Sequence, residues 1–215
     1  MSQNTLTQYD LEELARPLMG LLDDFQNHFI GWMKIHQLML DGKPVSTDRI
    51  AAHLGLTQDE VTALLKGAEL DQEGNVVGIG LSIVPTPHSY RIRGRQLYTW
   101  CAGDATFFPI LHKSTAVIES PDPISGEKIR LTSTPEGVRD LDPVTAVVSW
   151  VPGREGYENV RTWLCNYTNF FTSAETASQY VAKHPGMLIV PVDQVFRIGQ
   201  LIWEREPYKS LISGL

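Results

Sequence analysis

Two cysteines and one aspartate are the side chains of this sequence best suited to chemistry. Cys101 and Asp104 lie three residues apart, and Cys165 is the second of the two cysteines in the chain. A helix over Leu97 to Phe108 would place both reactive groups on one apolar face, together with Leu97, Trp100, Phe107 and Phe108. Apolar surroundings favour the neutral carboxylic acid and raise the pKa of Asp104. A thiol one helical turn from such a proton acceptor is a candidate reaction centre.

The same side chains have a purely structural interpretation. A cysteine on an apolar face often serves as a small core hydrophobe, and an inward Asp often only binds nearby backbone groups. Cys165 lies within Thr162 to Phe171, an aromatic-rich stretch that we expect to be strand-like and to precede a capped helix. The residues alone therefore leave chemistry and core packing both open.

The spacing of the cysteines and histidines argues against several kinds of site that two thiols could form. No Cys-x-x-Cys pair occurs, which argues against a thioredoxin-type redox centre. A structural zinc ion is bound by four ligands. No histidine lies at ligand spacing from a cysteine or another histidine; the six are His28, His36, His53, His88, His112 and His184. A cysteine hydrolase needs a histidine base, for which His112 and His184 are candidates. Two thiolates and one carboxylate suit a soft, thiophilic ion of low coordination number.

The elements that must position these groups begin with helices. Leu11 to Leu40 is amphipathic and predicts one long helix or two shorter ones, with a restart at Pro17. Ser46 and Thr57 are the expected N-caps of two further helices. The first third of the chain is therefore predicted to be mainly helical.

A hairpin follows these helices. Asp71 to Asn75 is a predicted turn, and Val76 to Ile83 alternates well enough to form one strand. The order of helix, helix, tight turn, helix and hairpin is typical of a winged helix. We therefore expect a winged-helix-like segment over residues 1–83.

Charge argues against nucleic-acid binding by this segment. Residues 1–80 hold five Lys and Arg against twelve Asp and Glu, so they carry the whole net charge of −7. A DNA reader needs cations to neutralise phosphates. The helix that would enter the groove offers Asp59 and Glu60 against the single Lys66. We predict a packing or dimer module that does not bind nucleic acid.

Residues 84–215 are expected to form an α+β domain. Short strands with turn punctuation predict a mainly antiparallel β-sheet core with flanking helices. Helices are predicted from a cap at Thr172 to about His184, and from a cap at Asp193 to about Glu206. Strands are expected within Arg91–Gln96, Ala116–Glu119, Ile129–Thr132, Ala146–Val151 and Met187–Val192.

The residues around the first cysteine resemble the organomercurial lyase (alkylmercury lyase) family. The resemblance covers most of the chain and includes the second cysteine with the Phe-Phe pair that follows it. It is carried by Leu97-Tyr98-x-Trp100-Cys101-Ala102-x-Asp104, Phe108-Pro109 and the hairpin Asp71-x-x-Gly74-Asn75-Val76-Val77-Gly78-x-Gly80-Leu81.

The resemblance implies a catalytic set of Cys101, Asp104 and Cys165. The implied reaction is protonolysis of the carbon–mercury bond of alkyl and aryl mercury compounds, which yields a hydrocarbon and Hg(II) and serves mercuric resistance and detoxification. Both thiolates would hold mercury and make its carbon more basic, while Asp104 takes a thiol proton and delivers it to carbon. Trp100, Phe107 and Phe170 are candidates for the apolar wall beside the organic group.

Partners and alternatives follow from the same interpretation. The implied substrate is an organomercurial, Hg(II) stays on Cys101, Cys165 and Asp104 as product, and free thiols or a mercuric reductase collect it. No organic cofactor is implied, because no glycine-rich phosphate loop occurs. The alternative is a non-catalytic protein of the same fold that binds or senses a thiophilic metal.

The sequence departs from the family pattern at positions outside the catalytic set. Asn166 stands where some members have another cysteine, Asn169 where many have histidine, and His112-Lys113-Ser114 differs from the usual small and basic residues. The sequence predicts a cytoplasmic protein whose thiols are reduced, because Met1 to Asp10 is polar and does not resemble a secretory signal. It also predicts no membrane span, because no run of about 20 apolar residues occurs.

Overall fold

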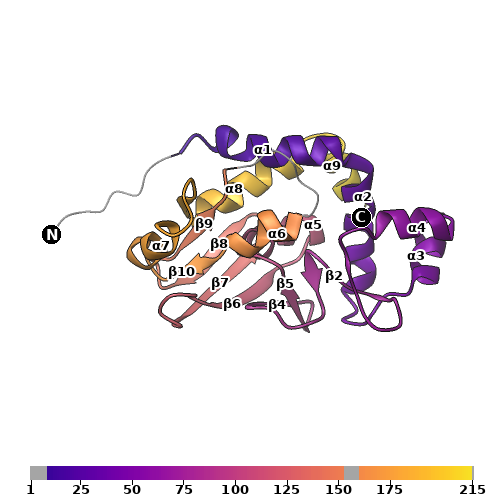
Figure 1. Cartoon of the computed structure of the whole chain (residues 1–215), viewed down its shortest axis with the longest axis horizontal. Helices are drawn as coiled ribbons and strands as arrows, with labels where there is room; N and C mark the ends of the chain where they lie inside the picture. The colour runs from indigo at the N-terminus through magenta and orange to yellow at the C-terminus, as the bar shows by residue number, and fades with distance from the viewer. Residues whose placement is uncertain (1–8, 153–159, 215) are drawn as a thin grey trace.

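Within residues 9–152 and 160–214, which the computed structural model describes, an antiparallel sheet of eight strands is the central element (Figure 1). Its strand order is β1-β2-β3-β5-β4-β6-β7-β8, and a smaller sheet has the order β10-β9-β11. The strands of the large sheet are β1 (Glu69–Leu70), β2 (Val76–Ile79), β3 (Leu81–Ser82), β4 (His88–Ile92), β5 (Arg95–Thr99), β6 (Ala116–Pro121), β7 (Lys128–Thr134) and β8 (Gly137–Asp142). Those of the smaller sheet are β9 (Val147–Trp150), β10 (Phe170–Phe171) and β11 (Leu188–Pro191).

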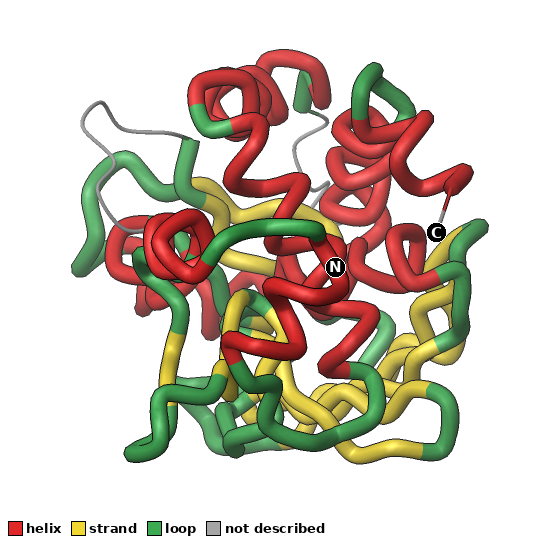
Figure 2. Tube along the Cα trace, turned by 90° about the vertical axis from the view of Figure 1, so that its right-hand side faces the viewer, coloured by secondary structure: helices red, strands yellow, loops and turns green. Residues whose placement is uncertain are grey.

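Helices cover the large sheet in successive layers. α5 (Ala102–His112) packs against β7 and β5, α8 (Val192–Trp203) packs on α5, and α1 (Leu11–Asp24) packs on α8. Figure 1 shows α1 and α8 running above the sheet, and in the side view of Figure 2 most helices lie above most strands. The remaining helices are α2 (Gln26–Met39), α3 (Thr47–Leu54), α4 (Gln58–Leu64), α6 (Val160–Trp163), the 3₁₀ helix η1 (Cys165–Tyr167), α7 (Ala174–Val181) and α9 (Tyr208–Gly214).

The first two helices separate at Phe25 and not at Pro17. Pro17 lies inside α1, so the expected restart there is wrong. Proline in a helix interior destabilises it by about 3 kcal/mol. Leu14, Leu21 and Leu22 are buried on either side of it, and each buried leucine contributes roughly 1.5–3 kcal/mol. Packing therefore keeps the helix continuous through the proline.

The helical part of the winged-helix pattern is confirmed. Ser46 caps α3 by accepting the N–H of Arg49, and Thr57 caps α4 in a capping box with Glu60. These caps are local side-chain interactions within three residues, and for that reason they can be read from the sequence. The hairpin of β1 and β2 follows α4 in the expected order.

The stretch Val76 to Ile83 forms two strands, and the expectation of one strand is wrong. Gly80 has φ of +80°, which residues with a side chain rarely adopt, and it turns the chain between β2 and β3. Gly78 consequently pairs with Ser82, and β3 continues the sheet by pairing with β5. The division of the chain at residue 83 stays a prediction.

The α+β class is confirmed, with local corrections. The sequence patterns did not predict β8 and α9. β8 is a largely solvent-accessible edge strand, and its residues do not alternate between apolar and polar. α7 is capped by Ser173, one residue after the predicted cap. α8 begins directly after Pro191, so Asp193 lies in its first turn and does not cap it. Among the described residues, no helix is both long and apolar enough to cross a membrane.

Candidate active site

Cys101 lies at the junction between β5 and α5. β5 ends at Thr99, and the N–H of Trp100 donates to the carbonyl of Gly80 at 2.8 Å. Cys101 is extended and serves as the N-cap of α5, with its Sγ accepting the N–H of Asp104 at 3.3 Å. The predicted helix over Leu97 to Phe108 is therefore wrong in its first part, because sheet pairing with β4 extends the strand to Thr99. The cap bond still brings Cys101 and Asp104 together.

Asp104 lies in the first turn of α5 and faces a cavity. A Cβ at Gly80 would lie 3.9 Å from Asp104 Oδ2 and 3.0 Å from Cζ of Phe108, so a glycine is required where β2 and β3 approach α5. Burial raises the pKa of Asp104 to about 7, although hydrogen bonds with both cysteines act to lower it. At neutral pH this carboxyl can therefore both accept and release a proton.

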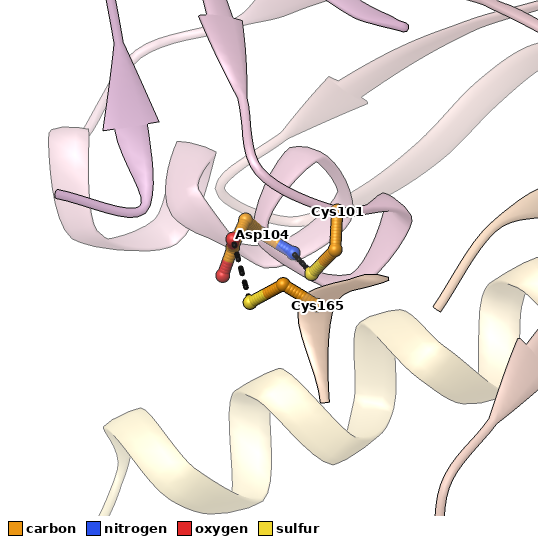
Figure 3. Close-up of side chains that lie close together, drawn as sticks. All are labelled: Cys101, Asp104 and Cys165. Atoms are coloured by element: carbon orange, nitrogen blue, oxygen red, sulfur yellow. Dashed lines mark hydrogen bonds between the residues drawn. The ribbon is translucent and has the colours of Figure 1, made fainter. Parts of the chain in front are cut away.

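Cys165 reaches the same place from the other side. It is buried at the start of η1, where the expected strand is in fact a short helix, α6, followed by a 3₁₀ turn. The N–H of Ala102 donates to the carbonyl of Thr168 at 3.0 Å, which ties this turn to the first residue of α5. The Cys165 thiol donates to Asp104 Oδ2 at a sulfur–oxygen distance of 3.8 Å (Figure 3). The ligand atoms of Cys101, Asp104 and Cys165 all lie within 4.8 Å of one another.

Both thiols are held protonated by their surroundings. Burial raises the pKa of Cys101 well above its usual value, and the hydrogen bond with Cys165 and the charge of Asp104 act in the same direction. For Cys165, the hydrogen bond from Cys101 acts to lower the pKa, but burial and Asp104 outweigh it and the pKa is raised. The positive charge of Arg161 also acts to lower the pKa of Cys165. A soft metal must therefore displace these protons when it binds sulfur.

The cavity that contains the three groups has a volume of about 80 Å³ and is almost entirely apolar. Trp100 and Phe107 line it as predicted, whereas Phe170 lies in the core against His88. Helices far apart in the sequence complete the wall with residues that the sequence analysis missed, because most of them are apolar and look like ordinary core. These residues include Leu18 and Leu22 of α1, Trp32 and His36 of α2, and Ile202 and Trp203 of α8.

The two histidines considered for a hydrolase are engaged elsewhere. The His112 side chain bonds the Tyr90 hydroxyl at 3.1 Å and His36 at 3.4 Å, and burial lowers its pKa well below the usual value. His184 bonds the carbonyl of Tyr180 at 2.9 Å. The Cys165 thiol instead donates to Asp104 Oδ2, and the Cys101 sulfur accepts the N–H of Asp104. This arrangement suits two-sulfur binding of a soft metal next to an acid that carries a proton.

Comparison with known proteins identifies the family. The family model for MerB, described as alkylmercury lyase, matches residues 81–204. The alkylmercury lyase of Staphylococcus epidermidis is 36% identical over 201 residues, which cover 91% of this chain and 93% of that protein. The alkylmercury lyase of Pseudomonas putida is 35% identical over 183 residues and covers 84% of both chains.

A solved structure agrees in fold. The crystal structure of the mercury-bound form of MerB2 superposes with a TM-score of 0.73 at 21% identity and covers 95% of this chain and 100% of that chain. This likeness supports the α+β architecture described above. With the family model and the relatives that cover most of its length, this chain belongs to the alkylmercury lyase family.

Proposed function

We propose that this chain cleaves the carbon–mercury bond of alkyl and aryl mercury compounds by protonolysis. In this proposal Cys101 and Cys165 bind mercury and Asp104 supplies the proton. The observation that carries the proposal is the convergence of these three ligand atoms within 4.8 Å on the wall of an apolar cavity. The cavity matches the apolar organic group, and the sulfurs match the soft metal.

Mercury capture comes first in the proposed sequence. The substrate arrives with its mercury bound to carbon and to a small thiolate, which leaves as a thiol after taking one proton from the site. The remaining thiol proton passes to Asp104. The hydrogen bond that the Cys165 thiol donates to Asp104 Oδ2, at a sulfur–oxygen distance of 3.8 Å, supports Cys165 as the source of this proton.

Proton delivery to carbon completes the reaction. Two sulfur ligands increase the electron density at mercury and make the bound carbon more basic. Asp104 returns its proton to that carbon, the electron pair of the carbon–mercury bond forms the new carbon–hydrogen bond, and a hydrocarbon leaves. A pKa of about 7 lets Asp104 hold the proton at neutral pH, which an ordinary aspartate does not do.

Hg(II) then remains on the two sulfurs, with an Asp104 oxygen beside it. We propose that free thiols or a mercuric reductase remove it by thiol exchange, and that the protein works in the cytoplasm, where its two free cysteines stay reduced. The acidic segment over residues 1–83 is proposed not to bind nucleic acid.

Hydrocarbon release tests the proposal directly. Purified protein with excess small thiol should release methane from methylmercury and benzene from phenylmercury, measured by gas chromatography. Cys101→Ser and Cys165→Ser should abolish release. Asp104→Asn should abolish release but still bind Hg(II), which separates proton supply from metal binding. Tight Hg(II) binding by the unmodified protein without hydrocarbon release would instead support the non-catalytic metal binder.

A further inference from the structure

One carboxylate outside the catalytic set connects the two cysteine-bearing segments. Glu69 of β1 accepts the indole N–H of Trp100 on Oε2 at 3.0 Å, and its Oε1 pairs with Nη1 of Arg161. The Arg161 guanidinium also lies over the Trp100 ring, 4.9 Å from its centroid. Glu69, Trp100 and Arg161 therefore form a three-way contact, which we call the Glu69 clamp.

The clamp acts on residues directly attached to the reactive groups. Trp100 immediately precedes Cys101, and Arg161 lies in α6, one turn before Cys165. α6 has four residues, and a helix this short has no stability of its own. Its position therefore depends on tertiary contacts such as the clamp.

Cys165 is fixed from both sides of its position in the chain. After it, the N–H of Ala102 bonds the carbonyl of Thr168. Before it, Arg161 contacts Glu69 and Trp100. Since Ala102 and Trp100 flank Cys101, both restraints connect the Cys165 segment to the Cys101 segment.

Gly78 shows that the sheet makes room for this carboxylate. It pairs with Glu69 between β1 and β2, and a Cβ on it would overlap Glu69 Oε2 and lie 3.2 Å from Nε1 of Trp100. The backbone of Gly78 is not in the left-handed region, so turn geometry does not require a glycine here. The absent side chain instead provides the space through which the carboxylate reaches Trp100.

The Arg161–Glu69 pair is less exposed than the pair of Lys128 and Glu119, chiefly at its cation. The side chains of Arg161 and Glu69 are 31% and 35% exposed, compared with 60% and 39% for Lys128 and Glu119. Solvent screens a partly buried pair less than an exposed one. The Glu69–Trp100 hydrogen bond adds a charge-assisted interaction.

We propose that Glu69 is a positioning residue for carbon–mercury cleavage: by holding Trp100 and Arg161 together, it keeps the Cys101 and Cys165 sulfurs at the separation at which both bind one mercury. The inference rests on the proposed function of the two cysteines. Without the clamp, α6 shifts and mercury binds through one sulfur more often than through two. Bond cleavage then slows, because the second sulfur is what makes the carbon basic.

Glu69→Gln is the sharpest test. Glutamine keeps an acceptor for the Trp100 indole and nearly the same volume, but it removes the charge that pairs with Arg161. The matched control is Glu119→Gln, which removes the ion pairs with Lys128 and Arg130 at 2.7 and 2.9 Å on the exposed face of β6. Each variant is assayed as the full reduced chain, with circular dichroism and thermal unfolding to verify the fold.

Two readouts separate positioning from stability. The first is competition of the protein with a small dithiol for Hg(II), with the ultraviolet charge-transfer band of mercury bound to two thiolates as the signal. The second is the kcat and KM of hydrocarbon release. Glu69→Gln should weaken Hg(II) binding and lower kcat, each by about tenfold, the size expected for a charge-assisted contact. KM should change much less, and Glu119→Gln should match the unmodified protein.

The outcomes decide between the interpretations. Unchanged Hg(II) affinity and kcat in folded Glu69→Gln would overturn the positioning role, even if its melting temperature falls. If Glu69→Gln does not fold, Arg161→Gln removes the same ion pair from α6 and takes its place, and Arg161→Lys should recover part of the loss. If the unmodified protein releases no hydrocarbon, the proposed function fails, whereas the Hg(II) competition still tests the clamp.

Discussion

Replacing Asp104 by asparagine should stabilise the folded protein at neutral pH, even though it removes the proposed proton donor. Burial raises the pKa of Asp104 from 3.8 to about 7 in the folded state. The unfolded chain has the ordinary pKa, so between these values it loses a proton that the folded protein keeps. The stability of the unmodified protein therefore falls as the pH rises through this window. The asparagine variant has no proton to lose and lacks this decrease.

The size of the effect follows from the pKa difference. About three pH units at 1.36 kcal/mol each give an upper bound of roughly 4 kcal/mol. The Asp104 residue as a whole has intermediate exposure, and we reduce this figure accordingly. We expect Asp104→Asn to gain about 2 kcal/mol relative to the unmodified protein above pH 7. The gain should disappear below about pH 4, where the carboxyl is protonated in both states.

Urea unfolding of the reduced proteins, followed by tryptophan fluorescence between pH 4 and 8, measures this difference. Asp122→Asn is a control of opposite sign. Burial acts to raise the pKa of Asp122, but N–H bonds from Thr172 and Ile124 outweigh it and lower the pKa. That variant should be less stable than the unmodified protein at neutral pH, with the loss shrinking as the pH falls. A stability difference for Asp104→Asn that stays constant with pH would refute the reasoning.

Three further substitutions test the cavity. Gly80→Ala should destabilise the protein by about 1–2 kcal/mol in urea unfolding and lower kcat, because φ is +80° and Phe108 lies 3.0 Å from the new Cβ; equal stability and activity would contradict this. Gly199→Ala should destabilise α8 packing by about 1–3 kcal/mol, since its Cβ would overlap Phe107. Trp203→Leu should enlarge the cavity and raise kcat/KM for bulky arylmercurials relative to methylmercury; an unchanged ratio would show that Trp203 does not limit the organic group.

Local signals made the starts of α3 and α4 predictable, and non-local pairing caused the errors at β3 and β5. Ser46 and Thr57 cap their helices through bonds within three residues, so their side chains are sufficient to place the caps. The apolar run into Cys101 fits a helix equally well, but pairing of β5 with β4 and β3 keeps it extended to Thr99. Gly80 similarly divides a stretch whose alternation predicts a single strand. In both cases the deciding partner lies elsewhere in the chain.

The reactive residues were recognisable for a different reason than the cavity around them. Cys101, Asp104 and Cys165 are chemically distinctive, so residue type and a family resemblance were enough to select them. Trp32 and Trp203 are not distinctive, because large apolar residues on amphipathic helices fill cores far more often than they line cavities. The Glu69 clamp likewise joins residues from three separate segments, and no spacing along the sequence connects them.

One apolar cavity accounts both for the weak acidity of the thiols and for the basicity of Asp104. Burial raises the pKa of Cys101 and, together with the Asp104 charge, that of Cys165, so both thiols keep their protons at neutral pH, whereas Asp104, with a pKa of about 7, can still accept one. Bound mercury stabilises thiolate charge directly and releases the thiol protons. In the proposed reaction, one of these protons passes from Cys165 to Asp104 Oδ2, which lies 3.8 Å from its sulfur, and Asp104 then delivers it to carbon. A more polar cavity would favour thiolates before mercury arrives, but it would also lower the pKa of Asp104 toward its ordinary value, and the carboxylate would then hold a thiol proton poorly at neutral pH.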